Sequence, residues 1–139
     1  MVILDTNVVS ELMKKQPDAK VLDWLEGQKT GQLYLTAITI AEIRRGLALL
    51  PEGQRRTALE QAFDRFLELG FNERVLSFTP ATARVYAPIY RARIEAGLGV
   101  GELDLLIAAI ARQQDAAIAT RNTGDFEQTG VRLTNPWLD

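Results

Sequence analysis

The feature of this sequence that most constrains its fold is the alternation of short apolar runs with longer segments of helical periodicity. The longer segments are long enough for helical crossovers, which favours parallel strands with helices on both faces of the sheet. The alternation therefore predicts an α/β fold, a three-layer α/β/α sandwich with a mainly parallel central sheet of about five strands. The runs with the length and composition of buried strands are residues 2–4, 33–35, 75–78, 116–119 and 131–133.

The predicted helices carry start and stop signals. Asp18 is placed to cap one helix, and Pro51 with Gly53 separates two helices that should form a hairpin. Residues 82–96 follow a helical pattern, and residues 102–114 form a helix that is apolar on almost every side. We expect this last helix to be buried.

The length of the chain, 139 residues, matches one domain. No repeat, low-complexity stretch or linker-like composition divides the sequence, so we predict a single domain over residues 1–139. No apolar run approaches the roughly 20 residues that a membrane-spanning helix needs. The first residues lack the basic segment of a secretory signal and meet an acid at position 5, so we expect a cytoplasmic protein with no membrane association.

The absence of cysteine and histidine excludes several kinds of chemistry. Disulfides, thiolate catalysis, sulfur-ligated zinc, a Ser-His-Asp triad and histidine general bases are all ruled out. Any acid–base chemistry must therefore use carboxylates, lysine, tyrosine or metal-bound water. The formal net charge of −2 would repel nucleic acid, but 12 of the 16 cationic side chains are arginines, which suit phosphate. Any nucleic-acid surface must therefore be a local patch.

Three acidic residues are predicted to meet at one edge of the sheet. Asp5 ends the first strand, and Glu42 lies in the first turn of the helix after the second strand. Asp104 lies in the first turn of the buried helix. Because ligands of parallel sheets bind at the carboxyl ends of the strands, these three carboxylates are candidate catalytic residues.

Each acid also has a purely structural interpretation. Asp5 could cap a helix that begins near Val8, and the segment 39–42 fits the S/T-x-x-E capping box. Asp104 is the only polar residue in positions 103–111, and an acid in an apolar segment is costly unless something pairs with it. A cation is the simplest partner, and oxygen ligands without His or Cys favour Mg²⁺ or Mn²⁺ over zinc.

A polar loop follows the fourth apolar run and should lie at the same edge of the sheet. An ordinary turn would also use Asn, Gly and Asp, so the loop alone does not decide between a turn and a site. The segment reads Ala119-Thr120-Arg121-Asn122-Thr123-Gly124-Asp125-Phe126.

Together these segments resemble the four motifs of PIN domains, especially those of VapC-type and FitB-like toxins. The resemblance spans nearly the whole chain, and the order and spacing of the motifs are more specific than any one of them. The matching segments are Asp5-Thr6-Asn7, residues 39–42, Leu103-Asp104-Leu105-Leu106-Ile107-Ala108-Ala109, Ala119-Thr120-Arg121-Asn122 and the closing Asn135-Pro136-Trp137.

The resemblance implies a Mg²⁺- or Mn²⁺-dependent endoribonuclease of a type II toxin–antitoxin pair. Such toxins are usually homodimers, or dimers within a toxin–antitoxin complex, and a peptide of the cognate antitoxin occupies the groove. By this resemblance Asp5, Glu42 and Asp104 match the acidic metal-site positions. Asp5 and Asp104 would hold the metal, and Glu42 would be a further ligand or orient the attacking water. Single-stranded RNA fits a shallow groove better than an A-form duplex, whose deep groove hides its bases.

One position departs from the family pattern. Many relatives have an acid after Thr-Arg, where this sequence has Asn122, with Asp125 three residues later. An amide oxygen brings no charge, so a second metal would be held less firmly unless Asp125 turns inward. The sequence therefore fits either one metal, or one tight and one weak.

Other residues are candidates for supporting roles. Thr6, Asn7 and Thr120 could orient the metal ligands. Five arginines could contact the RNA backbone, although each could equally be a solvated helix charge: Arg44, Arg45, Arg91, Arg93 and Arg121.

Two other functions stay open on the sequence alone. One is a PIN-like binding module with weak catalysis or none, which Asn122 permits. The other is a Mg²⁺-dependent phosphatase or a receiver-like domain. The phosphatase motif needs a second acid two residues after the first, where this sequence has Asn7. A receiver needs a lysine opposite its aspartate, and every lysine here lies between positions 14 and 29.

Overall fold

The central sheet of the computed structural model, which describes all 139 residues, has five strands and is parallel throughout. The strand order is β3-β2-β1-β4-β5, so the first strand of the chain lies in the middle and the order reverses beside it. This confirms the predicted sheet. The strands are β1 (Val2–Leu4), β2 (Leu33–Thr36), β3 (Val75–Leu76), β4 (Ala117–Ala119) and β5 (Leu133–Thr134).

The edge strands differ most from their predicted bounds. β5 begins at Leu133 rather than at residue 131, because its register follows β4, in which Ile118 pairs with Leu133. β3 has only two residues, and it pairs with the end of β2 through Val75 and Leu76. Pairing to a neighbour, rather than the apolar character of the strand itself, therefore sets the length of both edges.

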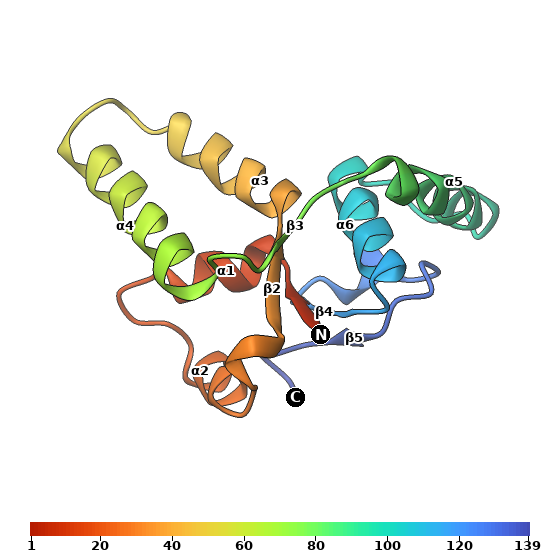
Figure 1. The fold of residues 1–139 in the computed structure, drawn as a ribbon, viewed down its shortest axis with the longest axis horizontal. Helices are drawn as coiled ribbons and strands as arrows, with labels where there is room; N and C mark the ends of the chain where they lie inside the picture. The colour runs from red at the N-terminus through yellow and green to blue at the C-terminus, as the bar shows by residue number, and fades with distance from the viewer.

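Helices cover both faces of the sheet, with α1, α2 and α4 on one side and α5 and α6 on the other (Figure 1). Successive residues of β1 point into different cores: Leu4 packs with Val8 and Phe63, and Ile3 packs with Ile107. The elements are α1 (Thr6–Leu12), α2 (Ala19–Glu26), α3 (Ala37–Ala48), α4 (Gln54–Gly70), α5 (Pro80–Glu95) and α6 (Glu102–Gln113), with 3-10 turns η1 (Thr30–Gln32) and η2 (Thr123–Phe126).

The predicted helix features are largely confirmed. Asp18 caps α2, with its side chain accepting a hydrogen bond from the Lys20 amide at 2.8 Å. α3 and α4 form the hairpin predicted on either side of Pro51. In α6, residues 107–111 are fully buried, as its apolar sequence predicted. No helix is long and apolar enough to cross a membrane.

The connection from α5 to α6 is a tight helix end. Gly97 adopts a left-handed conformation with φ of 71°, which a residue without a side chain reaches at little cost. The Gly97 amide donates to the Ile94 carbonyl and the Leu98 amide donates to the Arg93 carbonyl, both at 3.0 Å. This pair of bonds is the Schellman arrangement, which ends α5 sharply and sends the chain toward the first turn of α6.

Candidate active site

Asp5 lies at the carboxyl edge of the sheet, directly after β1, where its two carboxylate oxygens have different partners. Oδ1 accepts a hydrogen bond from the Thr6 amide at 2.8 Å and so caps α1. Oδ2 accepts hydrogen bonds from Thr120 Oγ1 at 2.7 Å and from Asn7 Nδ2 at 3.2 Å. Because β1 and β4 are neighbours, residues 115 positions apart in sequence meet here.

Glu42 is brought to the same edge by α3, although its place in that helix differs from the prediction. The N-cap is Thr36, whose hydroxyl accepts a hydrogen bond from the Thr39 amide at 3.1 Å. The expected capping box at 39–42 is therefore wrong, and Glu42 lies in the second turn rather than the first. Its Oε1 instead accepts a hydrogen bond from Thr6 Oγ1 at 2.8 Å, which links α3 to the start of α1.

Asp104 occupies the third position of α6, as predicted, and is partly buried. Its carboxylate folds back toward Gly101, where an added Cβ would lie 3.0 Å from Asp104 Oδ2. Burial raises the pKa of Asp104 to about 6, with further contributions from the charges of Asp5, Asp125 and Glu42. The charges of the other three carboxylates therefore disfavour the ionised form of Asp104.

The pKa of Asp5 is also raised, mainly by burial. Its hydrogen bonds from Thr120 and Thr6 oppose that rise, and the charges of Glu42 and Asp125 add to it. The ionised forms of both Asp5 and Asp104 are therefore disfavoured, and a nearby cation would offset that cost.

An acidic cavity of about 510 Å³ connects these side chains. Six of the residues predicted to belong to the site line it: Asp5, Thr6, Asn7, Glu42, Asp104 and Asn122. Arg121 lines it as well, and only one of its 11 lining residues is hydrophobic. Most of the predicted metal-site and supporting residues therefore surround a single polar space, and the exceptions are Thr120 and Asp125.

The donor chemistry of this cavity fits a hard divalent cation, because it offers carboxylate, hydroxyl and amide oxygens and no sulfur or imidazole. No three acidic side chains come close enough together in this conformation to hold an ion. Coordination would therefore require rotations of side chains other than Asp5, whose carboxylate is already held by three hydrogen bonds.

The two candidates for the fourth acidic position lie differently. Asn122 lines the cavity, and its backbone N–H donates a hydrogen bond to Thr120 Oγ1 at 3.0 Å. Asp125 lies in η2, is exposed and does not line the cavity. Its charge nevertheless raises the pKa of both Asp5 and Asp104. Asn122 therefore supplies the contact surface, while Asp125 acts only through its charge.

Asn7 joins three parts of the site. Its side-chain amide donates to Asp5 Oδ2 and to Thr120 Oγ1, both at 3.2 Å, and its Oδ1 accepts the Arg121 amide at 3.1 Å. Asn7 and Thr120 thereby fix the orientation of the Asp5 carboxylate and of the loop after β4.

The predicted arginines have different surroundings. Arg121 is exposed, and its guanidinium stacks over the Trp137 ring with 5.0 Å to the ring centroid. Arg44 covers Phe63 and pairs with Asp64 at 2.8 Å. Two more of the five predicted arginines, Arg45 and Arg91, are exposed, and Arg91 pairs with Glu95 at 2.7 Å.

Arg93 is a correction to the prediction. Its side chain is buried, with only 4% of the residue exposed, and donates hydrogen bonds to backbone carbonyls instead of facing solvent. An RNA backbone could not reach this side chain, so Arg93 is not a candidate RNA contact.

Four residues of the cavity wall were not predicted: Ser10, Glu11, Lys14 and Trp137. Glu11 is buried and accepts hydrogen bonds from Lys14 Nζ at 2.9 Å and the Asp18 amide at 3.1 Å, and the bond from Lys14 lowers its pKa. Asn7 and Glu11 are four residues apart and so lie on one face of α1, while Lys14 follows the end of that helix, and the spacing of the first two could have revealed Glu11.

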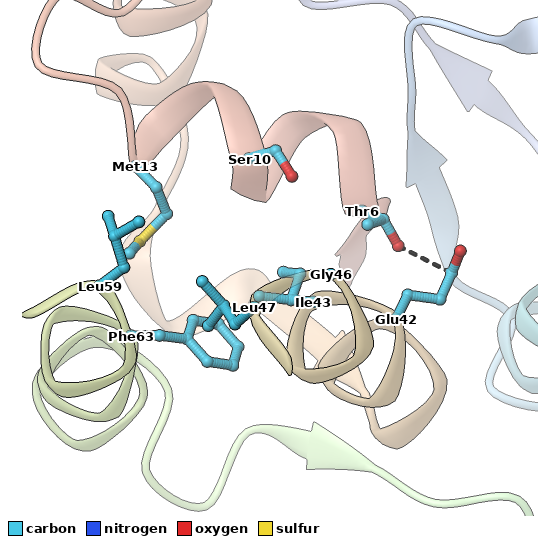
Figure 2. Close-up of a pocket in the computed structure, with 9 residues that line it drawn as sticks. All are labelled: Thr6, Ser10, Met13, Glu42, Ile43, Gly46, Leu47, Leu59 and Phe63. Atoms are coloured by element: carbon cyan, nitrogen blue, oxygen red, sulfur yellow. Dashed lines mark hydrogen bonds between the residues drawn. The ribbon is translucent and has the colours of Figure 1, made fainter. Parts of the chain in front are cut away.

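An apolar pocket of about 280 Å³ adjoins the acidic cavity and shares Thr6, Ser10 and Glu42 with it. Figure 2 shows it between α1 and the α3–α4 hairpin, with the Thr6–Glu42 hydrogen bond at one end. Its other lining residues are Met13, Ile43, Gly46, Leu47, Leu59 and Phe63.

The fold and this site together define the class of protein. The chain belongs to the PIN domain family, whose model matches residues 2–131. It is 42% identical over 137 residues to the VapC ribonuclease Y4jK of Sinorhizobium fredii, covering 99% of this chain and 98% of the relative. It is 38% identical to the toxin FitB of Neisseria gonorrhoeae over the full length of both. The crystal structure of FitAcB from Neisseria gonorrhoeae superimposes with a TM-score of 0.93 at 37% identity and covers 100% of both chains.

Proposed function

We propose that this chain is a metal-dependent endoribonuclease toxin that cleaves single-stranded or loop RNA and is neutralised by a cognate antitoxin. The observation that carries the proposal is the convergence of Asp5, Glu42 and Asp104 on one cavity, from three different elements. Likeness across the full chain to proteins named VapC ribonuclease and toxin FitB supports it.

Asp5 and Asp104 would hold a Mg²⁺ or Mn²⁺ ion, because both carboxylates are electrostatically strained without one. When bound, such an ion supplies Lewis acidity toward the phosphodiester and toward the attacking water. Glu42 Oε1 is occupied by Thr6, which leaves Oε2 free of hydrogen bonds. Glu42 Oε2 would accept the proton of the water or serve as a further ligand.

The substrate would enter over the exposed arginines. Arg121 lines the acidic cavity and its guanidinium lies over the Trp137 ring, a contact that would restrict the guanidinium before RNA arrives. The chain as a whole has a net charge of −2, so attraction of RNA would be confined to the surface around Arg121. A polar cavity beside exposed arginines suits single-stranded RNA better than an A-form duplex. We expect cleavage to take place in the cytoplasm.

The apolar pocket beside the cavity supports the antitoxin part of the proposal. It lies within reach of Glu42, so a peptide with apolar side chains bound there would also obstruct the acidic cavity. We expect the toxin to act as a homodimer, or as dimers within the toxin–antitoxin complex.

Incubation of the purified protein with a mixed RNA pool, with and without Mg²⁺ or Mn²⁺, tests the proposal, with new RNA ends identified by sequencing. Asp5→Asn should lower metal-dependent cleavage by about 100-fold or more, because it removes a charged ligand but keeps a capping oxygen. Asp18→Asn is the matched control, since Asp18 also caps a helix but lies outside the cavity.

Native circular dichroism of both variants would show that the loss at Asp5 is catalytic. Metal-dependent cleavage by Asp5→Asn at the parental rate would contradict the assignment. If the parent protein binds RNA and generates no new ends with either metal, the chain is a PIN-like binding module instead, which is the alternative that Asn122 leaves open.

A further inference from the structure

Arg93 is a buried cation for which the proposed chemistry has no use. Only 4% of the residue is exposed, and no carboxylate lies within ion-pair distance of it. Burying a guanidinium without a counter-ion is costly unless its donors are all engaged. An apolar side chain would avoid this cost, so the charge and the fork of donors at this position need an explanation.

The guanidinium of Arg93 joins two loops. On one side, Nε donates to the Gly99 carbonyl at 2.9 Å, and Nη2 donates to the same oxygen. On the other side, Nη1 donates to the carbonyls of Gly124 and Glu127, both at 3.0 Å. The three acceptors lie six, 31 and 34 residues from Arg93 in sequence.

Both loops carry residues of the acidic site. Gly99 precedes Gly101, the N-cap of α6, whose third residue is Asp104. Gly124 lies in η2 next to Asp125, two residues after Asn122. The main chain of Arg93 adds a further restraint, since its carbonyl accepts the Leu98 amide.

We propose that Arg93 is a positioning residue of the nuclease site, whose guanidinium fixes the loop that leads to Asp104 relative to the loop that carries Asn122 and Asp125. This inference rests on the proposed function. Arg93 touches neither the cavity nor the substrate, and it acts through the two loops alone. Its positive charge also opposes the electrostatic strain on Asp104, whose pKa it lowers.

Lysine cannot perform this role. Its ammonium is a point charge on a flexible stem, whereas the planar guanidinium bonds in two directions at fixed angles. Arg93→Lys therefore keeps the charge and loses the simultaneous contact with both loops. Arg84→Lys is the matched control, because Arg84 lies on the same helix, is exposed and makes no ion pair.

The test compares parent, Arg93→Lys and Arg84→Lys in Mn²⁺-dependent cleavage of a short RNA and, separately, in Mn²⁺ binding by calorimetry without RNA. We expect Arg93→Lys to lower kcat about tenfold or more, with KM within about twofold, because misplaced ligands impair the reacting geometry more than RNA contact. Its Mn²⁺ affinity should fall about threefold or more, as for other groups that orient ligands. Arg84→Lys should match the parent in every measurement.

Chemical rescue separates positioning from folding. Arg93→Ala leaves a space of guanidinium shape, so guanidinium at roughly 10–20 mM, well below denaturing concentrations, should restore part of its kcat and leave the control unchanged. If Arg93→Ala does not fold, Arg93→Lys alone decides. The proposal would be overturned if Arg93→Lys had the parental kcat and the parental Mn²⁺ affinity. It would also be overturned if the fall in activity of Arg93→Lys equalled the fraction of that variant that is unfolded.

Failure of the proposed function has a different signature. A parent protein that binds Mn²⁺ but cleaves no RNA overturns the nuclease assignment, and the Mn²⁺ affinities of Arg93→Lys and Arg84→Lys still decide the role of Arg93. A parent that neither binds Mn²⁺ nor cleaves RNA overturns both.

Discussion

At the scale of single residues, Asp5 divides its two carboxylate oxygens between the fold and the candidate site. One oxygen caps α1, and the other accepts hydrogen bonds from Thr120 and Asn7 at the wall of the acidic cavity. The structural and catalytic interpretations of this residue are therefore compatible. Because the hydrogen bonds fix the carboxylate in place before any ligand binds, little side-chain entropy would be lost on binding.

Asn122 and Asp125 give a prediction about metal dependence. Asn122→Asp places a new charge in the cavity wall and should lower the Mn²⁺ concentration for half-maximal cleavage about threefold or more. Asp125→Asn should change that concentration less than about twofold, because Asp125 is exposed and acts across solvent. Metal titrations of cleavage by the parent and both variants measure these values.

The opposite ranking would show that Asp125 turns into the cavity when metal binds. Should neither substitution alter the metal dependence, the loop after β4 does not belong to the metal site, which would then consist of Asp5, Glu42 and Asp104.

At the scale of secondary-structure elements, the start of α3 decides where Glu42 lies. Thr36 is buried, and its hydroxyl caps the helix. We predict that Thr36→Ala lowers the free energy of unfolding by about 1–2 kcal/mol. Glu42→Gln should change it by less than about 0.5 kcal/mol, because its side chain does not cap. Urea denaturation of the two variants measures both values.

If Glu42→Gln were the more destabilising change, residues 39–42 would form a capping box after all. Loss of RNA cleavage in Glu42→Gln with parental stability would instead agree with the catalytic role proposed for Glu42.

Sequence patterns predicted the elements whose character is strong and local. β1 and the buried helix α6 were placed within one residue, and the motif residues at the ends of β1 and β4 do meet. Patterns could not distinguish Arg93 from Arg91, because both lie on α5 and only distant carbonyls reveal which is buried. Trp137 was recognised only as part of a motif, since its stacking with Arg121 depends on tertiary structure.

At the scale of the whole molecule, the raised pKa of Asp104 makes the stability of the fold depend on pH. Asp104 has a folded-state pKa of about 6, above its ordinary value of 3.8. The folded chain therefore binds this proton more tightly than the unfolded chain, and the stability from Asp104 is present at low pH and lost as pH rises through about 6. At neutral pH, Asp104 destabilises the metal-free protein.

We predict that metal-free Asp104→Asn is more stable than the parent above pH 7, by about 1–2 kcal/mol once partial solvent exposure is allowed for. The difference should fall toward zero near pH 4, where Asp104 is protonated in the folded chain. Thermal unfolding from pH 4 to pH 8 measures it. Millimolar Mn²⁺ should raise Tm of the parent much more than Tm of Asp104→Asn. A difference independent of pH, or equal Mn²⁺ shifts, would contradict this account.

The placement of β1 at the centre of the sheet also has a consequence for protein synthesis. Asp5 emerges from the ribosome early, but its partner Thr120 lies 115 residues later, directly after β4. At roughly 5–20 residues per second, that interval lasts about 6–23 s. A growing chain therefore lacks the contact that holds the Asp5 carboxylate until translation is nearly finished, and under the proposed function unfinished polypeptides would carry no assembled site.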